Sequence, residues 1–498
     1  MSLARHFVTL LSGRLLSQLI LVGSTPILTR LYAPEDFGLI SLVNSITQIP
    51  LIYLMGRLEQ AVPQCRDDGE AGRVAGLALT FSLMITTLSA MLVYFNRDWI
   101  IERYHSPHLP EILLASIALF IPISISKLGQ QWSAYRERHG VTASADVLFT
   151  LSRRVLPIPL YSAWGASPWG LFTGQALGAV MSGGIYLNRM GRDVISLLSF
   201  RPSNLWLTLK EYRDFPLFLG MTSVLDVTVW GLFFAMIGDA FGLSAVGWLG
   251  QAYALLFLPI SLLNQSSTNI FYPRLARARE DQEALSSLVK RMQNLSFDLG
   301  LFPLLALIPI SPQLWGWMLG DAFYMSGVLA QALIPLALIT LIFSPVSVAI
   351  NVFNRQRDFF SQALILNTLR LGAVYLGCWH EGLKSSFESE EHLCLVISAY
   401  SAVTVIFRLG QLFWILKMMK VKARGLISGL FVKLSYTAVA LLAIYVARES
   451  FRLDLIPLML ITVLFGSGWL GLVLSYNLDA QSLMKRWRSR LGSAQSGD

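Results

Sequence analysis

Three charged residues lie in an apolar stretch, residues 142–161, that is otherwise suited to a membrane. If this stretch is a helix, Asp146, Arg153 and Arg154 share one face, at positions i, i+7 and i+8. Arg153 follows Gly140 by 13 residues, which places it roughly 20 Å along the axis and near the middle of a bilayer core about 30 Å thick. Guanidinium groups at that depth are too costly to face lipid, so the pattern predicts a cationic, water-filled path. A buried Asp146–Arg154 ion pair is the alternative.

Polar faces of the same kind recur in other apolar segments. Such faces often hold membrane helices together, which is the alternative to a lining role. The arginines favour the lining role, because lipid would not tolerate them. We therefore predict a substrate-binding surface made of Arg14, Gln18, Asn44, Arg153, Arg154, Arg370 and Arg408.

The predicted interior carries an excess of positive charge. Eight Lys and Arg residues fall within apolar segments, against the acids Asp146, Asp226 and Asp298. Guanidinium groups bind diphosphate through forked hydrogen bonds, so this excess suits an anionic passenger. Lys127 and Lys433 are weaker candidates, because they lie near enough to a membrane surface to extend toward it.

Asp226 and Asp146 are candidates for ion coupling. A carboxylate inside a membrane can bind a proton or a sodium ion and so tie transport to a gradient. The alternative is that each acid neutralises a neighbouring arginine.

The composition indicates an all-α, polytopic membrane protein. Of the 498 residues, 54% are hydrophobic and only 14% are charged, whereas soluble domains average roughly 25% charged residues. The net charge of +9 does not indicate nucleic-acid binding, because the basic residues lie in short loops between apolar segments. We expect about fourteen membrane-spanning helices, at residues 7–29, 37–62, 74–95, 112–131, 142–162, 168–188, 216–237, 245–271, 295–318, 327–352, 359–379, 393–416, 426–447 and 455–477.

Loop charges predict the orientation in the membrane. Loops on the side of the N-terminus hold 25 Lys and Arg residues, loops on the other side hold 6, and the remaining 8 lie within the spans. Basic loops stay in the cytoplasm, so both termini are predicted to be cytoplasmic.

A repeated spacing of glycine and proline, the sequence echo, predicts two related halves. Pro50 follows Gly38 by 12 residues, and Pro259 follows Gly247 by 12. Parallel repeats of this kind place a substrate site where two bundles meet. The predicted domains are a six-helix bundle at 1–190, a cytoplasmic linker with an amphipathic segment at 191–215, a second six-helix bundle at 216–420, and an extra helix pair with a basic tail at 421–498.

Signals for catalysis are poor. The six histidines lie in loops or at span ends, and the sequence has no phosphate-binding loop, zinc-protease motif or nucleophile elbow. We predict no catalytic residues, no metal site and no cofactor.

Three stretches resemble one family. ILTRLYAPEDFGLISLVNSI (27–46), SAYRERHGVTASADVLFTLSRRV (133–155) and NVFNRQRDFF (351–360) are similar to segments of bacterial polysaccharide flippases. These proteins belong to the multidrug/oligosaccharidyl-lipid/polysaccharide exporter superfamily. The resemblance covers about residues 1–420.

This resemblance implies a V-shaped chamber between two six-helix bundles. Such a protein moves an undecaprenyl-diphosphate-linked oligosaccharide across the bacterial inner membrane by alternating access, for lipopolysaccharide O-antigen or exopolysaccharide synthesis. Basic lumen residues would hold the diphosphate while the polyprenyl tail stays among the membrane lipids. Polysaccharide polymerases would be neighbouring partners.

Two alternatives stay open. A multidrug/cation antiporter of the same superfamily would be expected to bury more acids than arginines. A membrane-embedded glycosyltransferase, polymerase or ligase acting on the same carrier usually has a large outer loop, whereas the outer loops here, near 96–111 and 380–392, are short.

Overall fold

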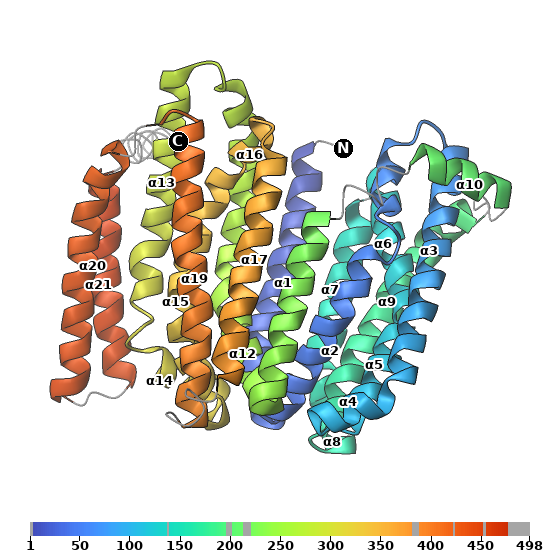
Figure 1. The fold of residues 1–498 in the computed structure, drawn as a ribbon, viewed down its shortest axis with the longest axis horizontal. Helices are drawn as coiled ribbons and strands as arrows, with labels where there is room; N and C mark the ends of the chain where they lie inside the picture. The colour runs from blue at the N-terminus through green and yellow to red at the C-terminus, as the bar shows by residue number, and fades with distance from the viewer. Residues whose placement is uncertain are drawn as a thin grey trace, which may run out of the picture. The chain divides into compact units, whose positions relative to one another are not determined.

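A computed structural model describes residues 3–136, 139–195, 202–212, 221–380, 388–421, 424–451 and 455–476. The described residues form helices with no strand among them, as the composition predicts (Figure 1). Seven of these helices are long and apolar enough to cross a membrane, or eight if the bent pair α2–η1 counts as one span. The exact number of fourteen spans stays a prediction.

The first part of the chain forms one run of helices. In order they are α1 (Leu3–Leu31), α2 (Pro34–Tyr53), η1 (Leu58–Gln64), α3 (Asp68–Phe95), α4 (Arg97–Tyr104), α5 (His108–Ala118), α6 (Phe120–Tyr135), α7 (His139–Val155), α8 (Pro157–Trp164), α9 (Pro168–Ile195) and α10 (Pro202–Glu211).

The second part continues in the same way. It contains α12 (Met221–Arg277), α13 (Gln282–Leu305), α14 (Ser311–Leu319), η2 (Asp321–Phe323), α15 (Tyr324–Ser347), α16 (Ala349–Val352), α17 (Gln356–Trp379), α19 (Ser389–Met418), α20 (Arg424–Phe451) and α21 (Leu455–Tyr476). Two predicted spans share α12, which breaks at Gly242, where φ is 84°. The helix is interrupted between α13 and α14, just after Pro303 and at Pro309, as prolines in an apolar segment favour.

The chain divides into two compact units. The first unit comprises Met1–Gln251, Gly316–Met325 and Phe360–Tyr400, and the second comprises Ala252–Trp315, Ser326–Phe359 and Ser401–Asp498. The boundaries of these units reflect contacts in space and do not coincide with those of the predicted repeat. The predicted division into bundles at 1–190 and 216–420, with the linker and the extra pair, therefore stays a prediction.

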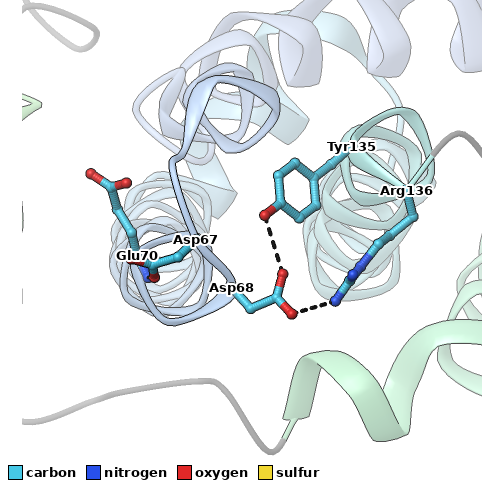
Figure 2. Close-up of polar contacts among 5 residues, drawn as sticks. All are labelled: Asp67, Asp68, Glu70, Tyr135 and Arg136. Atoms are coloured by element: carbon cyan, nitrogen blue, oxygen red, sulfur yellow. Dashed lines mark hydrogen bonds and ion pairs between the residues drawn. The ribbon is translucent and has the colours of Figure 1, made fainter.

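In the first unit, the N-terminal turn of α3 holds the end of α6. Asp68 accepts a hydrogen bond from the Tyr135 hydroxyl at 3.1 Å and pairs with Arg136 at 2.6 Å (Figure 2). Glu70 points away from this pair (Figure 2) and accepts a hydrogen bond at 2.8 Å from the hydroxyl of Tyr212, just after α10. Burial and this bond raise the pKa of Tyr212. One helix end thus anchors both a neighbouring span and the amphipathic segment.

The two glycines of the sequence echo pack against each other in the first unit. A methyl group on Gly38 would lie 1.8 Å from the carbonyl oxygen of Leu243, and one on Gly247 would lie 2.0 Å from that of Pro34. The contact is reciprocal, because Pro34 precedes Gly38 by four residues and Leu243 precedes Gly247 by four. Only glycine permits so close an approach of two backbones.

Replacing either glycine by alanine should force the two helices apart. We expect Gly38→Ala and Gly247→Ala each to destabilise the protein by about 1–3 kcal/mol, the usual cost of overpacking. Thermal melting of the purified protein in nanodiscs measures this loss. Gly372→Ala is the matched control, because no atom lies within 4 Å of the added methyl group. Equal melting temperatures for all three variants would contradict the close crossing.

A buried ion pair joins α20 to α13 in the second unit. Lys433 Nζ lies 2.5 Å from Asp298 Oδ1, and the two side chains are only 6% and 5% exposed. The indole N–H of Trp469 on α21 donates to the backbone carbonyl of Asp298 at 2.9 Å. The expectation that Lys433 extends to the membrane surface is wrong, because a carboxylate inside the bundle neutralises it.

Removing one partner of this pair should cost more than removing both. Lys433→Met takes away the counter-charge of Asp298, and breaking a buried pair typically costs about 3–5 kcal/mol. The double variant Lys433→Met/Asp298→Leu should recover most of that loss, because apolar pairs replace buried ion pairs at little cost. The melting temperatures of the wild type, the single variant and the double variant in nanodiscs measure these losses of stability. A double variant as unstable as the single one would argue against the ion pair.

Candidate functional site

A polar cavity of about 350 Å³ lies inside the first unit. Its walls come from α2, α5, α6, α7 and α9, and many of its lining side chains are amides or hydroxyls. Three of the predicted site residues line it together: Asn44, Asp146 and Arg153. The sequence therefore identified residues from separate helices that share one polar space.

Helix α9 can approach α7 closely because it is rich in glycine. A methyl group on Gly178 would lie 2.9 Å from the carbonyl oxygen of Phe149 on α7. Across the cavity, Gln175 on α9 donates to Asn44 Oδ1 at 2.9 Å, and Asn44 donates to Gln175 Oε1 at 3.4 Å. This amide pair ties α9 to α2, so α2, α7 and α9 are held together at one side of the cavity.

The charged side chains that line the cavity, among those the structure describes, are two cations and one acid. Asp146 and Arg153 lie seven residues apart on α7 and both line the space, as the helical period predicts. Lys127 from α6 is the second cation. A polar cavity with one excess positive charge is suited to bind an anion, since charge-assisted hydrogen bonds to oxyanions are the strong ones.

Arg154 is half-buried but is not among the residues that line this cavity. Consecutive residues of a helix point about 100° apart, which separates it from Arg153. The side chain of Arg14 lies outside the described residues. Gln18 is half-buried on α1, and its Oε1 has no hydrogen-bond partner within the part of the chain described here.

A separate group of hydrogen-bonded side chains in the first unit contains Asp226 and Arg370. Asn367 donates to Asp226 Oδ1 at 3.1 Å and accepts from the guanidinium of Arg370 at 3.2 Å. Arg370 also lies over the ring of Tyr400, with its guanidinium carbon 5.3 Å from the ring centre. The structure thus links a predicted coupling acid to a predicted substrate-binding arginine through one amide.

Arg408 lies in the second unit and contacts aromatic rings. Its guanidinium carbon is 4.3 Å from the ring centre of Phe343 and 5.9 Å from that of Phe359. It also donates to Gln411 Oε1 at 2.8 Å. Cation–π contacts of this kind stabilise a half-buried guanidinium.

The sequence model of the polysaccharide biosynthesis protein family matches residues 27–326, which is more than half of the chain. The chain belongs to this family. No match was found among curated proteins.

The fold of this family member is that of known lipid and drug transporters. A lipid II flippase, MurJ, in an inward closed conformation superposes with a TM-score of 0.69 at 12% identity, over 95% of this chain and 99% of that one. An inward-facing multidrug resistance MATE transporter of the MOP superfamily superposes with a TM-score of 0.61 at 15% identity, over 82% and 94% of the two chains. These likenesses show the fold and, with the apolar helices, a multi-pass membrane protein.

From the sequence, Lys127 was predicted to be a weak candidate for the site of this family member. The charge was visible within an apolar segment, but its depth suggested a side chain that extends to the membrane surface. In the structure, Lys127 Nζ instead donates to the backbone carbonyl of Leu51 at 2.9 Å. The other missed lining residues, Gln130 and Gln175, are single amides in apolar segments, and no spacing rule distinguishes them from amides in helix contacts.

Among the described residues, no group of three or more His, Cys, Asp or Glu side chains could hold a metal ion.

Proposed function

We propose that this protein is a flippase for undecaprenyl-diphosphate-linked oligosaccharides in the bacterial inner membrane, with both termini in the cytoplasm. It carries its passenger to the outer leaflet by alternating access, for O-antigen or exopolysaccharide synthesis. The observation that carries this proposal is the polar cavity in which Arg153 and Lys127 outnumber Asp146. Membership of a polysaccharide biosynthesis family and the fold of a lipid flippase support the same conclusion.

Each part of the cavity has a task in this proposal. Arg153 binds the diphosphate, since a planar guanidinium offers two parallel donors to a phosphate group. The amides of Asn44 and Gln175, with Gln18 as a further contact, bind sugar hydroxyls. Arg14, Arg154, Arg370 and Arg408 bind the headgroup at other stages of the cycle. The protein acts as a transporter and not as an enzyme, and polysaccharide polymerases use the lipid that it delivers.

The multidrug antiporter is the second candidate, because the MATE fold supports it. The charge of the cavity argues against it: a site for cationic drugs needs an excess of acid, whereas this lining has the opposite sign. A drug-export assay in which the protein confers no resistance would be consistent with the flippase.

Arg153→Ala should abolish the flippase function. Loss of a charge-assisted contact to phosphate weakens binding by roughly tenfold or more. The assay is surface polysaccharide in a bacterial strain whose own flippase is deleted, with the membrane level of the protein checked by immunoblot. Arg73→Ala is the matched control, since Arg73 is an exposed arginine of α3 outside the cavity. Normal polysaccharide in the Arg153→Ala strain would refute this role for the cavity.

We further propose that a proton or sodium gradient drives the cycle through Asp226, with Asp146 as the second coupling acid. Asp226 is joined through Asn367 to Arg370. Neutralising the Asp226 carboxylate therefore weakens its electrostatic attraction to Arg370.

Asp226→Asn should remove the dependence of transport on the gradient. The measurement is lipid transport into proteoliposomes with an imposed pH or sodium gradient, compared with no gradient. The wild type should respond and the variant should not, because an amide neither titrates nor carries the charge that binds a cation. Leu225→Ala, a change of the neighbouring half-buried residue, serves as the control. An unchanged response in Asp226→Asn would eliminate Asp226 as the coupling acid.

A further inference from the structure

The membrane helix that begins with α2 is broken near the cavity. The axes of α2 and η1 differ by 48°. Between them, Gly56 and Arg57 both have φ of 59°, a left-handed conformation that costs a residue such as arginine on the order of 1–3 kcal/mol. Pro50 lies in the last turn of α2 and donates no backbone hydrogen bond. The last carbonyls of a helix lack intrahelical donors, and here Leu51 O and Tyr53 O accept turn bonds from the N–H groups of Leu54 and Gly56.

Lys127 of α6 supplies a further partner. Its ammonium donates to Leu51 O at 2.9 Å, and the N–H of Leu54 donates to the same oxygen at the longer distance of 3.4 Å. A cation is also favourable at a helix C-terminus, where the helix dipole is negative. Both Leu51 and Lys127 line the cavity, so the same ammonium group that caps the broken helix is within reach of a bound anion.

The break also contains polar atoms that the bent arrangement does not satisfy. Glu59 is 7% exposed, and its Oε2 and the Nε of Arg57 are buried without hydrogen-bond partners in the described part of the chain. Buried polar groups normally find partners, and unsatisfied ones favour another arrangement in which they do. A change of conformation at the break between α2 and η1 would let these atoms find partners.

From these observations we propose that Lys127 couples occupancy of the cavity to the bend between α2 and η1. In the resting protein its ammonium caps α2 at Leu51. A diphosphate in the cavity competes for that ammonium, since a phosphate oxygen is a stronger acceptor than a backbone carbonyl. Its arrival therefore uncaps α2 and loosens the segment 51–60. This inference rests on the proposed function for the identity of the anion, but the capping role of Lys127 does not.

Hydrogen exchange of the full-length protein in nanodiscs tests the proposal. The probe is geranyl diphosphate, with inorganic phosphate as a comparison, and the readout is amide exchange in peptides covering residues 51–60. In the wild type, geranyl diphosphate should raise exchange there. Lys127→Met should already show exchange about tenfold or more above the wild type without ligand, and geranyl diphosphate should add nothing. Lys127→Arg keeps a cation that can cap and should restore the response.

The outcomes separate this inference from the proposed function. If the resting exchange of Lys127→Met equals that of the wild type, the capping role is overturned, whatever the ligand does. If geranyl diphosphate binds the wild type, as calorimetry shows, but leaves 51–60 unchanged, the coupling is overturned while the proposed function stands. If it does not bind at all but Lys127→Met loosens the segment, the proposed diphosphate site fails while the capping role stands. A response to inorganic phosphate as large as that to geranyl diphosphate would assign the ligand as free phosphate and not a lipid headgroup.

Discussion

A bilayer core offers no water to polar groups, so each one inside the protein must find its partner within the chain or in a wet cavity. The described charges meet this condition in three ways. Lys433 pairs with a buried acid, Arg408 lies against aromatic rings, and Lys127 caps the end of a broken helix. Among the predicted interior cations whose side chains the structure describes, Arg153 and Lys127 line the cavity. The same requirement thus applies to cations in helix contacts and to cations that line the cavity, and depth in the membrane alone does not separate them.

The helices themselves were predictable, because apolar segments of this length leave few alternatives. Most described residues of the predicted spans lie in helices, including those of the two spans that share α12, while the number of membrane crossings stays a prediction. The breaks within them were harder. Pro303 and Pro309 signalled the gap between α13 and α14, whereas the bend after α2 depends on Gly56 and Arg57, and Arg57 is not a residue type that predicts a left-handed backbone.

The cavity was predictable only in part, and the reason is geometric. Asp146 and Arg153 share one helix, so the period of that helix places both on one face. Asn44, Gln175 and Lys127 come from three other helices, and a single sequence contains no information on which helices are neighbours. Arg154 shows the limit of the helical argument, because residues at i+7 and i+8 share a broad face yet only the first lines the cavity.

The glycine pair shows what an internal echo adds to such reasoning. Gly38 and Gly247 were matched by their spacing to a following proline, and in the structure each backbone occupies the space that a side chain of the other would need. The contact is reciprocal, whereas the relation between two halves that the echo predicts stays a prediction. Pro50, the proline of that echo, lies at the end of α2 where Lys127 supplies the cap. A broken helix end capped by Lys127 thus lies beside the cavity, where an anion in the cavity would compete for the same ammonium group.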